Sequence, residues 1–189
     1  MYIIDRDGVL FDTCELNIKS YSEAADLLKL ETNIVNLTNS IHAGDSYSRF
    51  CRNVWQDIDQ SDVIKLSKIK QNVFRNNLGL AVLNVDFISK YLKDQRNVCL
   101  LTKASKDSTL ILLNHFGVSV FGEDVYSTQD YEQNSKIIAI SDLQTKRSLG
   151  NHEVTIIDDS AFLIEDLVSL GYDAIHYPHY CQMKGSSFE

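Results

Sequence analysis

Short apolar runs, separated by stretches of helical periodicity, constrain the fold of this chain more than any other feature of its sequence. Runs without regular polar alternation are typical of strands buried on both faces of a parallel sheet. Helical patterns lie between most of them, most clearly over residues 105–117 and 160–171. The alternation predicts an α/β fold: a Rossmann-like parallel sheet flanked by helices. The predicted strands are residues 2–4, 98–101, 154–157 and 174–177, with 124–128 as a weaker fifth.

Residues 14–93 have a different pattern, in which no convincing strand is found. The stretch ELNIKSYSEAADLLKL places Tyr21, Ala24, Ala25 and Leu28 on one face of a helix. Two later stretches, SYSRFCRNVWQDI and DVIKLSKIKQNVFRNNL, also have helical periodicity. We therefore expect an all-helical cap at residues 14–93, inserted after the first strand. The α/β core then comprises residues 1–13 and 94–189.

Polar residues follow the predicted strands at the points where these strands end. Ligands of open parallel sheets bind outside the carboxyl ends of the strands, so these side chains are candidates for a binding site. They are Asp5 and Asp7 after the first strand, Thr102 after the second, and Asp158 and Asp159 after a later one. Lys136 stands near the start of the helical pattern SKIIAISDLQ. We expect these groups to meet at one edge of the sheet.

This group of side chains has a chemical rationale. Clustered carboxylates repel one another unless a cation joins them, and Mg²⁺ is the usual partner of oxygen ligands. With Lys136 and Thr102 added, the site suits a phosphoryl group, whose charge the cations offset and whose oxygens the hydroxyl and backbone N–H groups hold. One carboxylate can attack phosphorus, and a second can move the protons. Gly8 lacks a Cβ where backbone N–H groups are expected to approach the phosphate.

Four segments resemble the motifs of the haloacid dehalogenase-like hydrolase superfamily, in the same order. DRDGVLFDT resembles the first motif of its phosphatases, LLTKAS the second, and TIIDDSAFLIEDLVSLGY the acidic fourth. Lys136 falls where the lysine of the third motif is expected. The helical insertion resembles the cap of the phosphoglycolate phosphatase and β-phosphoglucomutase branch.

The resemblance implies a role for each matching residue. Asp5 would be the nucleophile and Asp7 the general acid and base. Thr102 and Lys136, with Gly8, would bind the transferring phosphoryl group. The Mg²⁺ ligands would be Asp5, the main-chain carbonyl of Asp7, and the pair Asp158 and Asp159, either of which could bind the ion directly.

Some positions depart from the family pattern and leave alternatives open. Lys103 directly follows Thr102 and is a rival to Lys136 for the phosphate-binding lysine. Ile137 stands where proline often follows the third-motif lysine, and Leu163 where close relatives often have glycine. Asn17 occupies the place of a histidine that acts in β-phosphoglucomutase-like enzymes, which disfavours a mutase.

The amino-acid composition argues against several classes of binding partner. The net charge of −8 argues against nucleic-acid binding, because a phosphate backbone requires a basic surface. No segment approaches the ~18 consecutive apolar residues of a membrane helix, and no leader pattern is evident. Four scattered cysteines without a CxxC pair argue against a zinc site and are typical of free thiols. We expect a cytoplasmic protein without nucleic-acid or membrane partners, and its oligomeric state stays open.

The sequence as a whole predicts a Mg²⁺-dependent phosphatase, a phosphoric monoester hydrolase. Its substrate would be a small phosphorylated metabolite such as a sugar phosphate or nucleotide, and its intermediate an aspartyl-phosphate at Asp5. One alternative is a phosphomutase of the same fold. Another is a non-catalytic protein that binds a phosphorylated ligand, for which Leu163 and the atypical second and third motifs leave room.

Overall fold

The computed structural model describes residues 1–42, 47–92 and 97–180. The chain divides into two compact units, one formed by Met1–Asp12 with Leu83–Glu189 and the other by Thr13–Val82. We call them the α/β unit and the helical unit. The chain thus returns to the α/β unit at Leu83, whereas the sequence pattern placed this return at residue 94.

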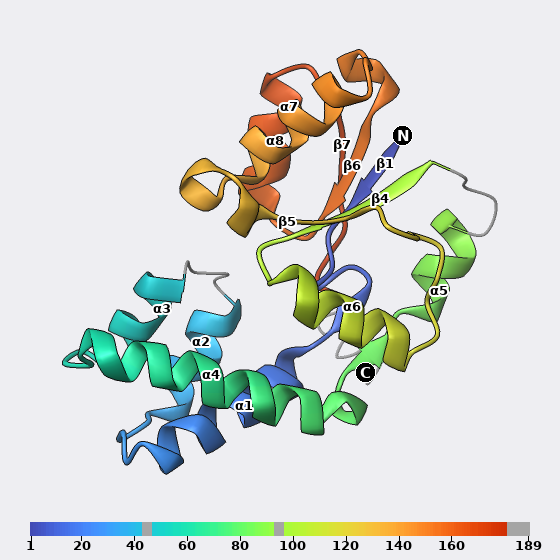
Figure 1. Cartoon of the computed structure of the whole chain (residues 1–189). Coiled ribbons are helices and arrows are strands. Elements are labelled where there is room, and N and C mark those ends of the chain that lie inside the picture. The colour runs from blue at the N-terminus through green and yellow to red at the C-terminus, as the bar shows by residue number, and fades with distance from the viewer. Residues whose placement is uncertain (43–46, 93–96, 181–189) are drawn as a thin grey trace, which may run out of the picture. The chain divides into compact units, whose positions relative to one another are not determined.

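The α/β unit contains a five-stranded sheet in which every pairing is parallel. Its order is β5-β4-β1-β6-β7, so the first strand lies in the centre (Figure 1). All five predicted strands are present, each with bounds within two residues of the prediction. They are β1 (Tyr2–Ile4), β4 (Val98–Thr102), β5 (Val125–Ser127), β6 (Thr155–Asp158) and β7 (Asp173–His176).

Three helices of the α/β unit begin at a serine. The side chains of Ser105, Ser135 and Ser160 accept a hydrogen bond from the backbone N–H three residues later, which caps each helix. These helices are α6 (Lys106–His115), α7 (Lys136–Lys146) and α8 (Ala161–Ser169). Shorter elements of this unit are α5 (Val85–Phe87), a π-helix (Ile88–Leu92), and the 3₁₀ turns Thr128–Asp130, Glu132–Asn134 and Asn151–Glu153.

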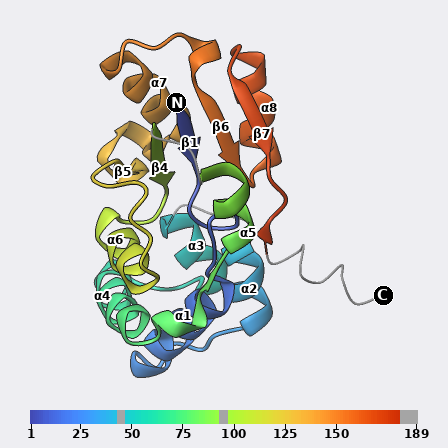
Figure 2. The same ribbon diagram turned by 90° about the vertical axis from the view of Figure 1, so that its right-hand side faces the viewer.

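Helices α7 and α8 cover one face of the sheet, and α5 lies on the opposite side (Figures 1 and 2). Alternate strand residues point to opposite faces, so Ile3 packs beneath α7 and α8 while Ile4 points to the other face. Both are buried, as the apolar runs predict for a sheet covered on two sides. The cluster below α7 and α8 contains Ile3, Cys99, Leu101, Ala139, Ile140, Leu143, Val154, Ile156 and Leu167.

The helical unit has a hydrophobic core of its own. Tyr21, Phe50 and Trp55 form an aromatic cluster in which the rings of Tyr21 and Phe50 are 4.4 Å apart between centroids. Ala24, Ala25, Leu37 and Leu66 complete the buried centre. Its helices are α1 (Cys14–Leu27), α2 (Ile34–His42), α3 (Tyr47–Val54) and α4 (Gln60–Asn76), followed by the 3₁₀ turn Leu78–Leu80.

The expectation of no strand in residues 14–93 was wrong in one place. A short strand, β3 (Val82–Leu83), pairs with β2 (Phe11–Asp12) where the chain passes between the units. Two residues are too few to produce a recognisable strand pattern. Among the described residues, no helix is both long and apolar enough to cross a membrane.

Asn84 anchors the loop after β1 within the α/β unit. It is fully buried, and its Nδ2 donates to the carbonyl of Val9 at 2.9 Å and to the hydroxyl of Tyr177 at 3.2 Å. Its Oδ1 accepts from the N–H of Phe87 at 3.0 Å. One side chain thus joins the first loop of the unit to α5 and to the segment after β7.

We predict that Asn84→Ala lowers the free energy of unfolding by about 2–4 kcal/mol, because it leaves the buried polar groups of Val9 and Phe87 without partners. Urea denaturation followed by far-UV circular dichroism measures the loss. Asn77→Ala is the control, since its side chain donates only to Val73 at the end of α4. Equal losses in the two variants would contradict the prediction.

Candidate active site

The carboxyl ends of the three central strands carry three of the predicted site residues. Asp5 follows β1, Thr102 ends β4 and Asp158 ends β6. Because β1 lies between β4 and β6, with Ile4 opposite both Leu100 and Ile157, the three residues emerge side by side. Their side chains are buried, so they face the interior of this edge and not bulk water.

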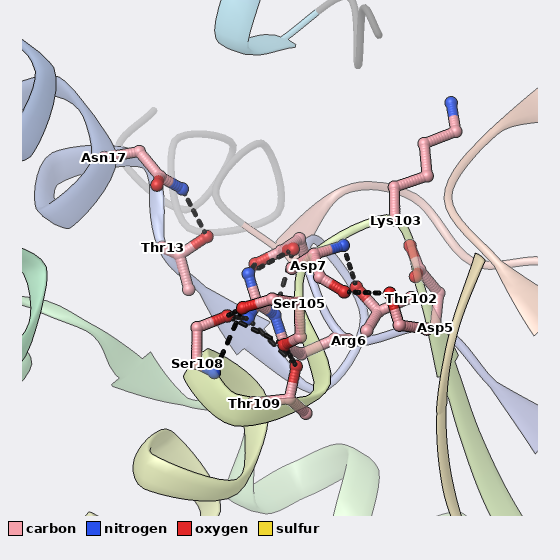
Figure 3. Close-up of polar contacts among 12 residues, drawn as sticks. Asp5, Arg6, Asp7, Thr13, Asn17, Thr102, Lys103, Ser105, Ser108 and Thr109 are labelled. Atoms are coloured by element: carbon pink, nitrogen blue, oxygen red, sulfur yellow. Dashed lines mark hydrogen bonds and ion pairs between the residues drawn. The ribbon is translucent and has the colours of Figure 1, made fainter. Parts of the chain in front are cut away.

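Lys136 joins two of these strand ends. Its Nζ lies 2.8 Å from Oδ1 of Asp5 and 2.6 Å from Oδ2 of Asp158, and the lysine is 8% exposed. The cap at Ser135 fixes the start of α7 and so places Lys136 in its first turn. Lys103, the rival lysine, is exposed and points away from Asp5 and Thr102 (Figure 3). The lysine in contact with the predicted nucleophile is therefore Lys136.

The electrostatic state of Asp5 follows from this crowding. Burial raises the pKa of Asp5 to about 8, and the neighbouring Asp158, Asp159 and Asp7 add to the shift while Lys136 opposes it. Burial works against the charge of Lys136, yet Asp5 and Asp158 outweigh it and raise the pKa of the lysine above its usual range. Lys136 therefore stays charged, whereas Asp5 binds its proton more tightly than an ordinary aspartate and would lose it more readily beside a further cation.

Three carboxylates can hold such a cation. Asp5, Asp158 and Asp159 each offer an oxygen, and these oxygens lie within 4.8 Å of one another. Burial and the neighbouring Asp158 also raise the pKa of Asp159. Three carboxylates against the single ammonium of Lys136 leave excess negative charge, and an all-oxygen donor set fits a hard divalent ion such as Mg²⁺.

The side chain of Asp7 does not join this group. Arg6 lies between the two aspartates in sequence, and its guanidinium binds the carboxylate of Asp7 with a shortest distance of 2.7 Å (Figure 3). The sequence predicts that Asp7 binds Mg²⁺ through its main-chain carbonyl, not its side chain, and this stays a prediction. Arg6 was missed in the sequence because an arginine between two aspartates reads as an ordinary surface charge.

Gly8 has a packing role that the sequence did not indicate, and its part in binding a phosphate stays a prediction. Its φ is +79°, and a Cβ there would lie 2.1 Å from Oδ2 of Asp159 and 2.6 Å from Cδ2 of His179. Its N–H donates to the carbonyl of Phe11 at 2.8 Å and is not free to meet a phosphate. Any larger residue would thus displace Asp159, which makes Gly8 a packing requirement of the site.

The segment after β7 contributes contacts that the sequence did not indicate. Backbone N–H groups of Tyr177 and Tyr180 donate to the carbonyls of Asp158 and Gly8, at 2.9 and 2.8 Å. Nε2 of His179 lies 3.7 Å from Oδ2 of Asp159. Residues 177–180 therefore lie against this part of the site, and no sequence motif predicts this contact.

Comparison with known proteins places this geometry in a structural context. No protein family profile matches the sequence, and no curated protein matches it significantly. A haloacid dehalogenase-like family hydrolase from Streptococcus pneumoniae is 14% identical, with a TM-score of 0.72 over 93% of this chain and 82% of that one. A subfamily IA hydrolase from Geobacter sulfurreducens is 18% identical, with a TM-score of 0.63 over 93% and 85%.

A third solved structure is a CbbY variant from Rhodobacter sphaeroides in complex with xylulose-1,5-bisphosphate. It is 16% identical, with a TM-score of 0.75 over 95% of this chain and 86% of that one. This chain has the haloacid dehalogenase-like hydrolase fold.

Two departures from the haloacid dehalogenase-like pattern have local explanations. Leu163 packs against the hydrophobic cluster beneath α7 and α8, so the core takes up its bulk. Nδ2 of Asn17 donates to Oγ1 of Thr13 at 3.1 Å, next to the start of α1 (Figure 3). Asn17 is therefore engaged in a local contact that supports the helix start.

We predict that Lys136→Met lowers the free energy of unfolding of the metal-free protein by about 3–5 kcal/mol at pH 8, because two buried carboxylates lose their counter-charge. The loss is smaller at pH 5. The pKa of Asp5 is about 8 in the folded protein against 3.8 as its ordinary value, and removing Lys136 raises it further. Below pH 8 the carboxyl is increasingly neutral in both folded proteins, so the missing charge matters less.

Urea denaturation at the two pH values measures this difference. Lys146→Met is the matched control, since Lys146 lies on the same helix and makes an exposed pair with Asp142. A loss at pH 8 no larger than that of the control would show that Lys136 does not stabilise the carboxylates.

Proposed function

We propose that this protein is a Mg²⁺-dependent phosphatase that hydrolyses a small phosphorylated metabolite through an aspartyl-phosphate at Asp5. The observation that carries the proposal is the contact of buried Lys136 with both Asp5 and Asp158, beside Asp159. This arrangement combines a nucleophile, a fixed cation and a set of oxygen ligands at one sheet edge. A non-catalytic site for a phosphorylated ligand would not need a buried carboxylate, which repels a phosphate, beside these groups.

Each residue has a distinct task in the proposed reaction. Because Lys136 occupies Oδ1 of Asp5, the other oxygen is available to attack phosphorus, and the bond to the leaving oxygen breaks. Asp7 protonates the leaving oxygen and later takes a proton from the water that attacks the aspartyl-phosphate, which returns Asp5 and releases phosphate. Thr102 and Lys136 hold the phosphoryl oxygens. Bound Mg²⁺ would offset the negative charge of the phosphoryl group and of the acidic cluster.

The solved structures support a small phosphorylated substrate. CbbY from Rhodobacter sphaeroides has been solved with phosphate as well as with the bisphosphate. A sugar phosphate is therefore our first choice for this protein, and a nucleotide the second. The helical unit would act as the cap that selects the substrate. The cytoplasmic location and the absence of nucleic-acid partners stay predictions from the sequence.

A phosphomutase is the less favoured activity on this fold. The place of the mutase histidine holds Asn17, which is bonded to Thr13. Analysis of the products separates the two activities, because a mutase returns the phosphoryl group to the sugar whereas a phosphatase releases it.

We predict that Asp5→Asn lowers Mg²⁺-dependent release of phosphate from p-nitrophenyl phosphate by roughly 1,000-fold or more, since an amide oxygen cannot serve as the nucleophile. Asp166→Asn, on the exposed side of α8, is the control and should retain wild-type activity. Mass spectrometry of the wild-type protein, quenched with acid during turnover, should show a phosphoryl adduct on Asp5. Equal rates in wild type and Asp5→Asn would remove Asp5 from the mechanism.

We also predict that the apparent affinity for Mg²⁺ rises about tenfold per pH unit between pH 6 and 8 and then levels off. The pKa of Asp5, raised to about 8, means that its carboxyl is protonated at pH 6 in the metal-free protein. The ion must displace this proton. Calorimetric titration in buffers of different ionisation enthalpy should detect proton release at pH 6. Affinity independent of pH over this interval would contradict Asp5 as a ligand.

A further inference from the structure

Arg6 is buried beside the site, with 3% of its side chain exposed. A guanidinium carries five N–H groups, and a buried one must find an acceptor for each. Nε donates to Oδ2 of Asp7 at 3.0 Å, and Nη2 donates to Oδ1 at 2.9 Å and to Oδ2 at 2.7 Å. Nη1 donates to Oγ of Ser108 at 3.3 Å and to Oγ1 of Thr109 at 3.2 Å. All three nitrogens of the guanidinium thus have partners.

The two hydroxyl groups that receive Nη1 are themselves fixed. Both Ser108 and Thr109 donate to the carbonyl of Ser105, at 2.9 and 3.0 Å. Their hydrogens are therefore directed toward the first turn of α6, which leaves their lone pairs for Arg6. Thr109 is fully buried, and Ser105 caps the helix. The orientation of Arg6 is thus set by the first turn of α6.

These contacts restrict the rotamers of the Asp7 side chain. Its side chain is 36% exposed, and a carboxylate so close to water would ordinarily sample several rotamers. The planar guanidinium holds both oxygens at once, which fixes direction as well as distance. A lysine ammonium at the same position would supply the charge but not the two-point geometry.

We propose that Arg6 is a positioning residue that aims the carboxylate of Asp7, and that Ser108 and Thr109 position Arg6 in turn. The proposal rests on the proposed function, in which Asp7 handles the protons of the reaction. It adds a chain of contacts that runs from the start of α6, through Arg6, to the side chain of Asp7. The end of β1 alone would not fix this side chain. Figure 3 shows this chain of contacts between Ser105 and Asp7.

Nuclear magnetic resonance tests the positioning without any need for turnover. In wild type we expect one Asp7 rotamer from three-bond couplings to its carboxyl carbon, and a slowly exchanging Nε–H of Arg6. In Arg6→Met, and in the double variant Ser108→Ala/Thr109→Val, the Asp7 couplings should become averaged. Arg147→Met is the matched control, because Arg147 pairs with Asp124 elsewhere in the same unit. Unchanged Asp7 couplings in Arg6→Met would overturn the proposal.

Kinetics test what the positioning does. We expect Arg6→Met to lower kcat about 10- to 100-fold with KM changed less than about threefold, as for a misplaced catalytic group. Arg6→Lys should recover only part of the loss. In an Asp7→Asn background, Arg6→Met should change kcat less than about threefold, since the group on which it acts is gone. Circular dichroism confirms that each variant is folded.

The outcomes separate this proposal from the proposed function. A wild type that releases no phosphate from any substrate rejects the phosphatase, while the Asp7 couplings still decide whether Arg6 aims Asp7. An active wild type with equal losses from Arg6→Met in both backgrounds, or an increased kcat in Arg6→Met, rejects positioning and leaves the phosphatase intact.

Discussion

The bridge from Lys136 to Asp5 and Asp158 is the interaction on which the site depends. Two buried carboxylates and a partly buried third at one sheet edge would repel one another, and the ammonium offsets part of that repulsion from within the protein. Lys136 reaches both acids because α7 begins at the capped Ser135. A shift of one residue in that start would turn the lysine by about a quarter of a turn and break the bridge.

The strand order explains why residues so far apart in the sequence meet. Since β1 pairs with β4 on one side and β6 on the other, its carboxyl end lies between Thr102 and Asp158. The loop after β1 is tied down by Asn84 and by the segment after β7, which binds the carbonyls of Asp158 and Gly8. The sheet sets the position of the site, and these ties set the path of its first loop.

Sequence patterns predicted the features that depend on local composition. The five apolar runs correspond to the five strands, and the polar residues after them mark the edge at which Asp5, Thr102 and Asp158 emerge. The roles of Arg6 and His179 could not be read in the same way, because each depends on a partner in another element. The sequence predicted a phosphate near Gly8, whereas the atoms that a Cβ there would meet in this structure belong to Asp159 and His179.

The distribution of cations among the carboxylates offers a physical basis for their different tasks. Asp5 and Asp158 share Lys136, Asp7 is bound by Arg6, and Asp159 has His179 at a longer distance. Burial raises the pKa of Asp5, so a further cation would strongly stabilise its charged form. The carboxylate of Asp7 lies outside this acidic group, and the guanidinium of Arg6 fixes its orientation. Different cationic neighbours would thus allow similar side chains at this end of the sheet to take the different roles proposed for them: nucleophile, metal ligand and proton carrier.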